Sequence, residues 1–286
     1  MKTIEIKKLP TAIGLNLAAL RASTKRPGAI ESLPEVTYVR PKVMVESRAV
    51  AAYAKVCGFK PEHGVPLLFP HLLAFPMSMM LFGSAHHPWP AMGTVHLANA
   101  ARLHRRINTG DVLRMEMQTG ELFAHDKGQI FTLHSRAIRN GHLVWESTGT
   151  FLRMGVKHIV GSTFKSELTD NSPLSHQADF YAGAGIGRRY GLTSGDVNPI
   201  HLTALSARIL GFKRAIAHGM WTKARALATL LPREPLDQAF ASAEFKTPLY
   251  LPARTSLWTH RNLDRTLFEV RNAQGDKPHL RALVQY

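Results

Sequence analysis

The spacing of apolar residues predicts one helix in the second half of the chain, and capping residues predict another. Residues 218–232, which end in Pro232, give the clearer pattern and predict a long buried helix. The apolar residues at this spacing are Met220, Ala224, Leu227, Ala228 and Leu231. A second helix is predicted over residues 200–210, because Asn198 is a good N-cap, Pro199 suits the first helical position and Gly211 supplies a stop.

Strand-like segments separated by turn residues predict antiparallel hairpins. Residues 129–137 and 142–152 flank Asn140-Gly141, and residues 267–271 and 279–284 flank a turn at 274–276. Residues 94–97 through 108–115 resemble residues 241–245 through 251–257, each with a strand, a connection and another strand. We therefore expect the same arrangement of strands in both halves.

The first half resembles a degenerate, or worn, copy of the second half. Residues 53–59 parallel residues 190–196, but Phe59 stands where the second half has Asp196. Residues 74–77 parallel residues 217–220, with Pro76, which has no amide hydrogen, in the place of Gly219. The first half also lacks the capped Asn-Pro-Ile-His turn of the second half. These differences predict one active site per chain.

Length agrees with two similar units, since 286 residues exceed a typical single domain of roughly 150. Residues 157–173 are polar and rich in Ser, Thr, Asp and Asn, which indicates a linker within about 157–175. We predict an N-terminal unit over residues 1–160 and a C-terminal unit over residues 161–286.

The formal net charge of +16 is compatible with nucleic acid, anionic membranes and phosphorylated metabolites. Basic residues are spread through the chain, with short concentrations at 104–106, 188–189 and 213–214 and no recognised nucleic-acid motif. We expect a solvated basic surface and only weak, nonspecific binding of nucleic acid.

The single Cys57 fits a reducing compartment, and no apolar run reaches the roughly 20 residues that span a bilayer. Apolar residues 12–20 are faintly similar to a signal peptide, but Glu5, Lys7 and Lys8 precede them and no convincing cleavage site follows. We expect a cytoplasmic protein without a membrane span.

The run from Tyr190 to His201 is the most informative stretch for chemistry. Asp196 lies two residues before the predicted cap and His201 lies in the first helical turn, so both side chains would share a small volume. The positive end of a helix favours an ionised carboxylate and a neutral imidazole. Such a pair could hold one water and transfer its proton.

This run resembles the signature of the MaoC-like dehydratases and (R)-specific enoyl-CoA hydratases, whose core is Ser-Gly-Asp-x-Asn-Pro-Ile-His. All fixed positions are present, although Thr203 stands where that family usually has an acidic residue or Asn. The resemblance implies an α+β double hotdog, in which two antiparallel sheets each wrap a central helix and merge into one continuous sheet. It implies a hydro-lyase that hydrates trans-2-enoyl thioesters through Asp196 and His201, without a cofactor.

The resemblance also implies roles around this pair. An amide at the start of the central helix polarises the thioester carbonyl, and Gly219 is our candidate. Ser194 and Asn198 are expected among the substrate-binding residues, where they would support the loop and cap the helix. His218 is expected to be a satisfied buried or capping histidine. Lys213 and Arg214 are candidates for the phosphates of coenzyme A.

The substrate would be carried by coenzyme A or by an acyl carrier protein, and the chain would stand alone or, as we favour, form a homodimer. The apolar, Met-rich residues 66–82 are either packed core or the lining of an acyl tunnel. A sharp preference for four-carbon substrates would count against the tunnel.

Three other functions stay open. A hotdog thioesterase would direct water to the carbonyl carbon and release free thiol, and a noncatalytic acyl-CoA sensor would bind without turnover. A nucleic-acid protein is favoured by charge alone. The 15 histidines show no spacing typical of a zinc site, and the sequence has no Gly-rich phosphate loop, so no metal is expected.

Overall fold

The computed structural model describes residues 2–22, 28–85, 87–157 and 161–286. The chain forms two compact units, each assembled from separated segments. Unit 1 comprises Met1–Met44, Pro70–Ala101 and Asp111–Glu167, and unit 2 comprises Val45–Phe69, Arg102–Gly110 and Leu168–Tyr286. No helix in the described part of the chain is long and apolar enough to cross a membrane.

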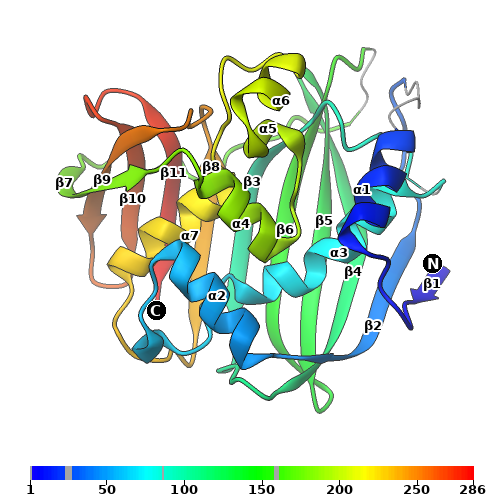
Figure 1. The fold of residues 1–286 in the computed structure, drawn as a ribbon, viewed down its shortest axis with the longest axis horizontal. Coiled ribbons are helices and arrows are strands. Elements are labelled where there is room, and N and C mark those ends of the chain that lie inside the picture. The colour runs from blue at the N-terminus through cyan, green and yellow to red at the C-terminus, as the bar shows by residue number, and fades with distance from the viewer. Residues whose placement is uncertain (1, 23–27, 86, 158–160) are drawn as a thin grey trace. The chain divides into compact units, whose positions relative to one another are not determined.

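Unit 1 is built on a sheet whose strands follow the order β1-β2-β4-β5-β6-β3. The strands are β1 (Lys2–Glu5), β2 (Val36–Met44), β3 (Thr94–Leu103), β4 (Val112–His125), β5 (Gly128–Arg139) and β6 (His142–Met154). The predicted turn between β5 and β6 is confirmed, because Asn140 and Gly141 both adopt positive φ, as a two-residue hairpin turn requires. The helices are α1 (Ala12–Arg21) and α3 (Phe69–Gly83) (Figure 1).

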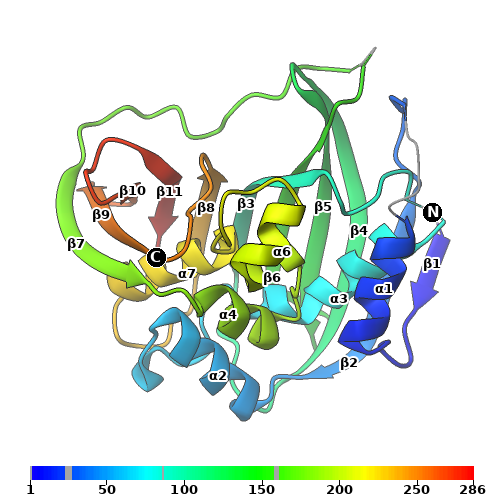
Figure 2. The ribbon, with the colours of Figure 1, turned by 45° about the horizontal axis from the view of Figure 1, so that its top comes forward.

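Unit 2 has an antiparallel sheet in the order β8-β11-β10-β9-β7. Its strands are β7 (Ser175–Ala182), β8 (Ala239–Phe245), β9 (Ala253–Arg261), β10 (Thr266–Asn272) and β11 (Pro278–Gln285). The helix predicted within 218–232 is confirmed as α7 (Gly219–Leu230), which contacts β11 and is largely buried. The remaining helices are α2 (Ser47–Cys57), η2 (Pro61–His63), α4 (Ile186–Ser194), α5 (Pro199–Leu202) and α6 (Ala204–Ile209), and α2 lies beside α4 (Figure 2).

The single helix predicted over residues 200–210 is wrong. Thr203 has extended backbone angles of −144° and 159°, so it ends α5 and begins α6. Its Oγ1 accepts a hydrogen bond from the Ser206 amide at 3.0 Å, which caps the second helix. A good N-cap in the middle of a helix-compatible sequence therefore broke the helix.

Helices α2 and α4 end in the same way, as the parallel between residues 53–59 and 190–196 predicts. Gly58 and Gly195 have φ values of 86° and 82°, and each donates its amide to the carbonyl four residues earlier. The rings of Tyr53 and Tyr190 lie 6.3 Å apart. Positive φ at both positions explains why glycine follows each helix.

Two details of the worn copy differ from the sequence interpretation. The first half does retain a turn that runs from Pro61, the first residue of η2, to His63, its last, but Lys60 at the N-cap position makes no side-chain cap hydrogen bond. Pro76 does not start a helix, because α3 begins at Phe69 and encloses it. Arg40 donates to the Leu73 carbonyl at 2.8 Å, three residues before this proline.

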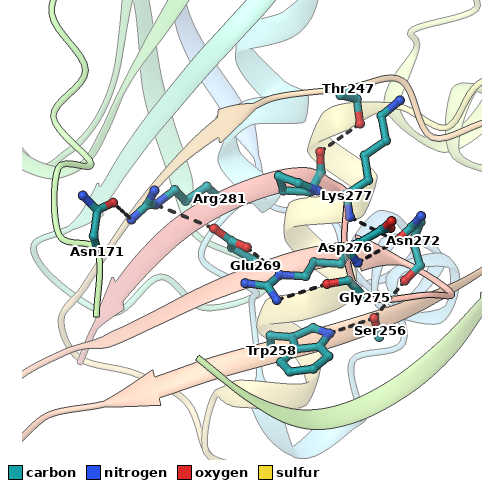
Figure 3. Close-up of polar contacts among 12 residues, drawn as sticks. Asn171, Thr247, Ser256, Trp258, Glu269, Asn272, Gly275, Asp276, Lys277 and Arg281 are labelled. Carbon is teal, nitrogen blue, oxygen red and sulfur yellow. Dashed lines mark hydrogen bonds and ion pairs between the residues drawn. The ribbon is translucent and has the colours of Figure 1, made fainter. Parts of the chain in front are cut away.

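Asp170 and Asn171, in the segment before β7, make polar contacts with side chains of the unit 2 sheet. Glu269 alternates with the buried Phe268 and Val270, so its side chain lies on the opposite face of β10. Arg281 lies beside Glu269 on β11 and donates to Asn171 Oδ1 at 3.0 Å (Figure 3). Asp170 forms an ion pair with Arg265 at 3.1 Å.

Candidate active site

Two glycines on helix α4 allow the chain that leads into α5 to pack closely against the helix. A Cβ atom at Gly187 would lie 2.0 Å from the His201 carbonyl oxygen, and one at Gly191 would lie 2.7 Å from the Asp196 carbonyl oxygen. Both distances are shorter than any contact that a real Cβ makes. The two glycines, one helical turn apart, therefore allow Asp196 and His201 to approach the helix.

The loop from Ser194 to Ile200 is ordered by its own side chains. Ser194 Oγ accepts from the Asp196 amide at 3.2 Å, and Asp196 Oδ1 accepts from the Asn198 amide at 3.3 Å. Asn198 Oδ1 in turn accepts from the Ile200 amide at 3.3 Å and caps α5. The structure thus places Ser194 and Asn198 as loop and cap residues, as their types indicate.

His201 is buried, and its proton is placed by a backbone carbonyl. Its Nδ1 lies 2.8 Å from the Ile216 carbonyl oxygen, so Nδ1 donates and Nε2 keeps its lone pair. Burial lowers the pKa of His201, while the Asp196 charge and the Ile216 hydrogen bond act in the opposite direction. Because α5 has only four residues, desolvation rather than the helix N-terminus keeps this imidazole neutral.

His218 lies against both members of the predicted pair. Its ring centroid is 3.6 Å from that of His201 with an interplanar angle of 25°, and its Nε2 donates to the Asp196 carbonyl at 2.9 Å. Burial, and then the neighbouring His201, lower its pKa to about 4. The structure buries His218, as expected, but the side chain caps no helix amide and Nδ1 has no partner within the described residues.

Sequence reasoning therefore missed His218 as a contact of Asp196 and His201. It lies 17 residues beyond His201, and only the fold brings the two rings together. The sequence did offer one signal, because an Ala-His-Gly run directly precedes a buried helix. His218 in this run is the N-cap residue, so it lies beside the first amides of the helix, and these amides face the site.

Gly219 is the first residue of α7, as predicted. A Cβ there would lie 2.7 Å from the Phe245 ring, so close packing excludes a larger residue. Its amide belongs to the first turn, whose N–H groups have no acceptor within the helix. The peptide that follows His218 therefore offers a donor beside the two histidines.

Lys213 and Arg214 are exposed in the turn after α6. The Lys213 carbonyl accepts from Arg208 Nε at 3.3 Å. Among the described residues, neither cation contacts Asp196, His201 or His218, so the structure does not bring this predicted pair into the cluster.

Asp196, His201 and His218 lie close enough that each could offer one atom to a metal ion, with these atoms within 4.8 Å of one another. The ring geometry disfavours a shared ion, because imidazole lone pairs lie in the ring plane and nearly parallel stacked rings direct them past each other. A carboxylate beside a neutral imidazole with a bare Nε2 is instead suited to holding a water molecule and accepting its proton.

Sequence comparison relates the chain to known proteins. Residues 186–279 match the family model of the MaoC like domain. The chain is 30% identical over 255 residues to 3-hydroxyacyl-thioester dehydratase X of Mycobacterium tuberculosis, across 89% of this chain and 91% of that protein.

Solved structures show the same fold. The crystal structure of HtdX from Mycobacterium tuberculosis is similar with a TM-score of 0.74 at 30% identity, covering 87% of this chain and 98% of that one. A MaoC-like dehydratase from Phytophthora capsici gives 0.73 at 15% identity, covering 90% and 96%. A further Mycobacterium tuberculosis protein described as a double hotdog gives 0.54 at 13% identity, covering 86% and 93%. The prediction of a double hotdog is confirmed.

Proposed function

Since this chain belongs to the MaoC-like dehydratase family, we propose that it is a hydro-lyase that reversibly hydrates trans-2-enoyl thioesters to (R)-3-hydroxyacyl thioesters. The observation that carries the proposal is the Asp196 carboxylate beside His201, whose Nδ1 is committed to a carbonyl and whose Nε2 is free to accept a proton. The thioester class follows from the relative named as a 3-hydroxyacyl-thioester dehydratase.

In the hydration direction, Asp196 and His201 hold one water molecule. His201 Nε2 accepts a proton from this water as its oxygen bonds to the β carbon of the enoyl group. The electron pair of the double bond moves toward the thioester, and the charge developing on the thioester oxygen is stabilised by the Gly219 amide at the start of α7. The imidazolium of His201 then returns the proton to the α carbon, so water is added and the enzyme is restored.

His218 positions this pair in the proposal. Its Nε2–H group holds the Asp196 backbone, and its ring supports the plane of His201. Because its pKa is lowered to about 4, the ring stays neutral beside His201 and adds no competing positive charge near neutral pH.

Lys213 and Arg214 are proposed to bind substrate phosphate, which their exposure allows. The cytoplasmic location and the homodimer also stay proposals, the latter measurable by light scattering of the purified chain. The acyl-tunnel role of residues 66–82 also stays a proposal; Met77 and Leu81 in this segment are fully buried.

The test uses purified protein with crotonyl-CoA and trans-2-decenoyl-CoA. We expect loss of enoyl absorbance without release of free thiol, and an (R)-3-hydroxyacyl product by chiral chromatography. Release of stoichiometric thiol would instead identify a thioesterase. Faster turnover of the ten-carbon substrate would support the tunnel, and a sharp preference for four carbons would oppose it.

A further inference from the structure

Helices α4 and α6, which flank the loop of Asp196 and His201, expose large apolar side chains. Leu192 on α4 is 80% exposed, and Leu205 and Ile209 on α6 are 71% and 77% exposed. The two α6 residues are four positions apart and so share one face of that helix. Single exposed leucines and isoleucines are common, but three of them on the two helices that flank one catalytic loop indicate a contact surface.

The chain segment that carries these apolar residues is rich in cations and poor in acids. Residues 184–214 contain five Lys and Arg residues, and their one acidic residue is Asp196 of the site itself. Within the described chain, none of the five cations forms an ion pair. On α4, Arg188 lies four positions before Leu192, and on α6, Arg208 lies between Leu205 and Ile209. The α4–α6 patch is defined as Arg188, Arg189, Leu192, Leu205, Arg208 and Ile209.

We propose that the α4–α6 patch docks an acidic carrier protein, which presents its acyl thioester to Asp196 and His201. The inference rests on the proposed hydratase function and adds the partner that delivers the substrate. The reason is complementarity: the patch offers unpaired cations around apolar anchors, which matches a partner with carboxylates around apolar residues. A partner seated on α4 and α6 lies over the loop that joins them, next to Asp196.

Other occupants match the patch less well. A second copy of this chain in a twofold interface would press the patch against itself, bringing like charges together without any acid to pair them. Free coenzyme A needs cations for its phosphates but has no use for three exposed aliphatic side chains. An anionic lipid surface also attracts cations with apolar residues, so it is included in the test.

The experiment compares one acyl group on two carriers. Wild type and the variants Leu205→Glu and Arg208→Glu are assayed with trans-2-decenoyl groups on acyl carrier protein and on coenzyme A. We expect each variant to lose about tenfold or more in kcat/KM for the carrier-protein substrate and to change less than about twofold for the coenzyme A substrate. Leu263→Glu, at a fully exposed position of the β9–β10 turn outside the patch, is the matched control and should change neither.

Equal losses on both substrates, or no loss on either, would overturn docking while leaving hydration intact. A direct binding measurement separates carrier-protein docking from the hydratase function. Suppose that wild type hydrates neither substrate but binds holo acyl carrier protein, and that Leu205→Glu abolishes this binding. Docking would then be supported, and the hydratase function would fail. Binding of wild type to phosphatidylglycerol vesicles, lost in the same variants while carrier protein does not bind, would overturn the proposal and assign the patch to lipid.

Discussion

Two histidines share one small volume in this site, and a backbone carbonyl fixes the proton of each. His201 donates from Nδ1 to Ile216, whereas His218 donates from Nε2 to Asp196. The two rings therefore expose different nitrogens, and only His201 is left with a free Nε2. In the proposed mechanism, this assignment makes His201 the base and His218 a positioning residue.

Replacing His218 should separate positioning from folding. His218→Ala leaves the Asp196 carbonyl without its donor and removes the ring stacked on His201, at a cost of about 1–3 kcal/mol for an unsatisfied buried group. We expect kcat for hydration to fall about tenfold or more with little change in KM. His218→Gln, whose amide can still donate, should recover part of kcat, and equal activity of both variants and wild type would exclude the positioning role.

The pH dependence of stability should carry the signature of His218. Its pKa is about 4 in the folded chain against 6.5 unfolded, so between these values the unfolded state binds more protons. Stability from this group is therefore present above pH 6.5 and is lost as pH falls toward 4, by about 3 kcal/mol in total. Urea unfolding at pH 7.5 and 5.0 should show a steeper loss for wild type than for His218→Gln, and parallel losses would contradict the assignment.

Among the elements, helix α4 controls the position of the loop that carries the proposed pair, Asp196 and His201, because its glycines leave room for that loop. Gly187→Ala would place a Cβ atom 2.0 Å from the His201 carbonyl oxygen, so the loop must move. We expect a destabilisation of about 1–3 kcal/mol and a fall in kcat of more than tenfold, since proton transfer depends on the place of His201.

Gly185→Ala is the control for this variant, because a Cβ atom there meets its nearest neighbour only at 4.0 Å. Its thermal midpoint and kcat should stay close to those of wild type. If Gly187→Ala were equally active, helix α4 would not control the loop.

Local chemistry explains which elements could be predicted from the sequence. The α7 helix and the β5–β6 hairpin carry strong local signals, a helical apolar period in one and Asn140-Gly141 in the other. At Thr203, a capping residue interrupts a sequence that is otherwise compatible with a helix. At Pro76, the packed helix α3 starts earlier and encloses the proline. Neither outcome can be read from local sequence.

The same limit applies to the site. Asp196 and His201 are five residues apart, so their proximity follows from one turn, whereas His218 reaches them only through the tertiary fold. The worn site shows a related effect. His63 ends η2 as His201 lies in α5, and its ring packs edge-on against Phe59 at 5.3 Å, where the second half has a carboxylate. The turns of the two halves align only when a gap of one residue is introduced after Phe59, so the ungapped parallel did not reveal the turn.

On the scale of the whole molecule, the chain crosses between its two units several times. Residues 45–69 and 102–110 belong to the same unit as residues 168–286, although they lie in the first half of the sequence. The retained turn at η2 and the intact turn at α5 therefore belong to one compact unit, but only the latter keeps its carboxylate. Of these two turns, only the one at α5 combines a carboxylate, Asp196, with its histidine, His201.

The most direct measurement is the rate of trans-2-enoyl-CoA hydration by wild type, Asp196→Asn and His201→Ala, with thermal unfolding as the check of folding. We expect both folded variants to lose at least about a hundredfold in kcat, since proton transfer by a positioned group contributes on that order or more. Wild-type rates in either folded variant would exclude Asp196 and His201 as the catalytic pair, because hydration would then proceed without them.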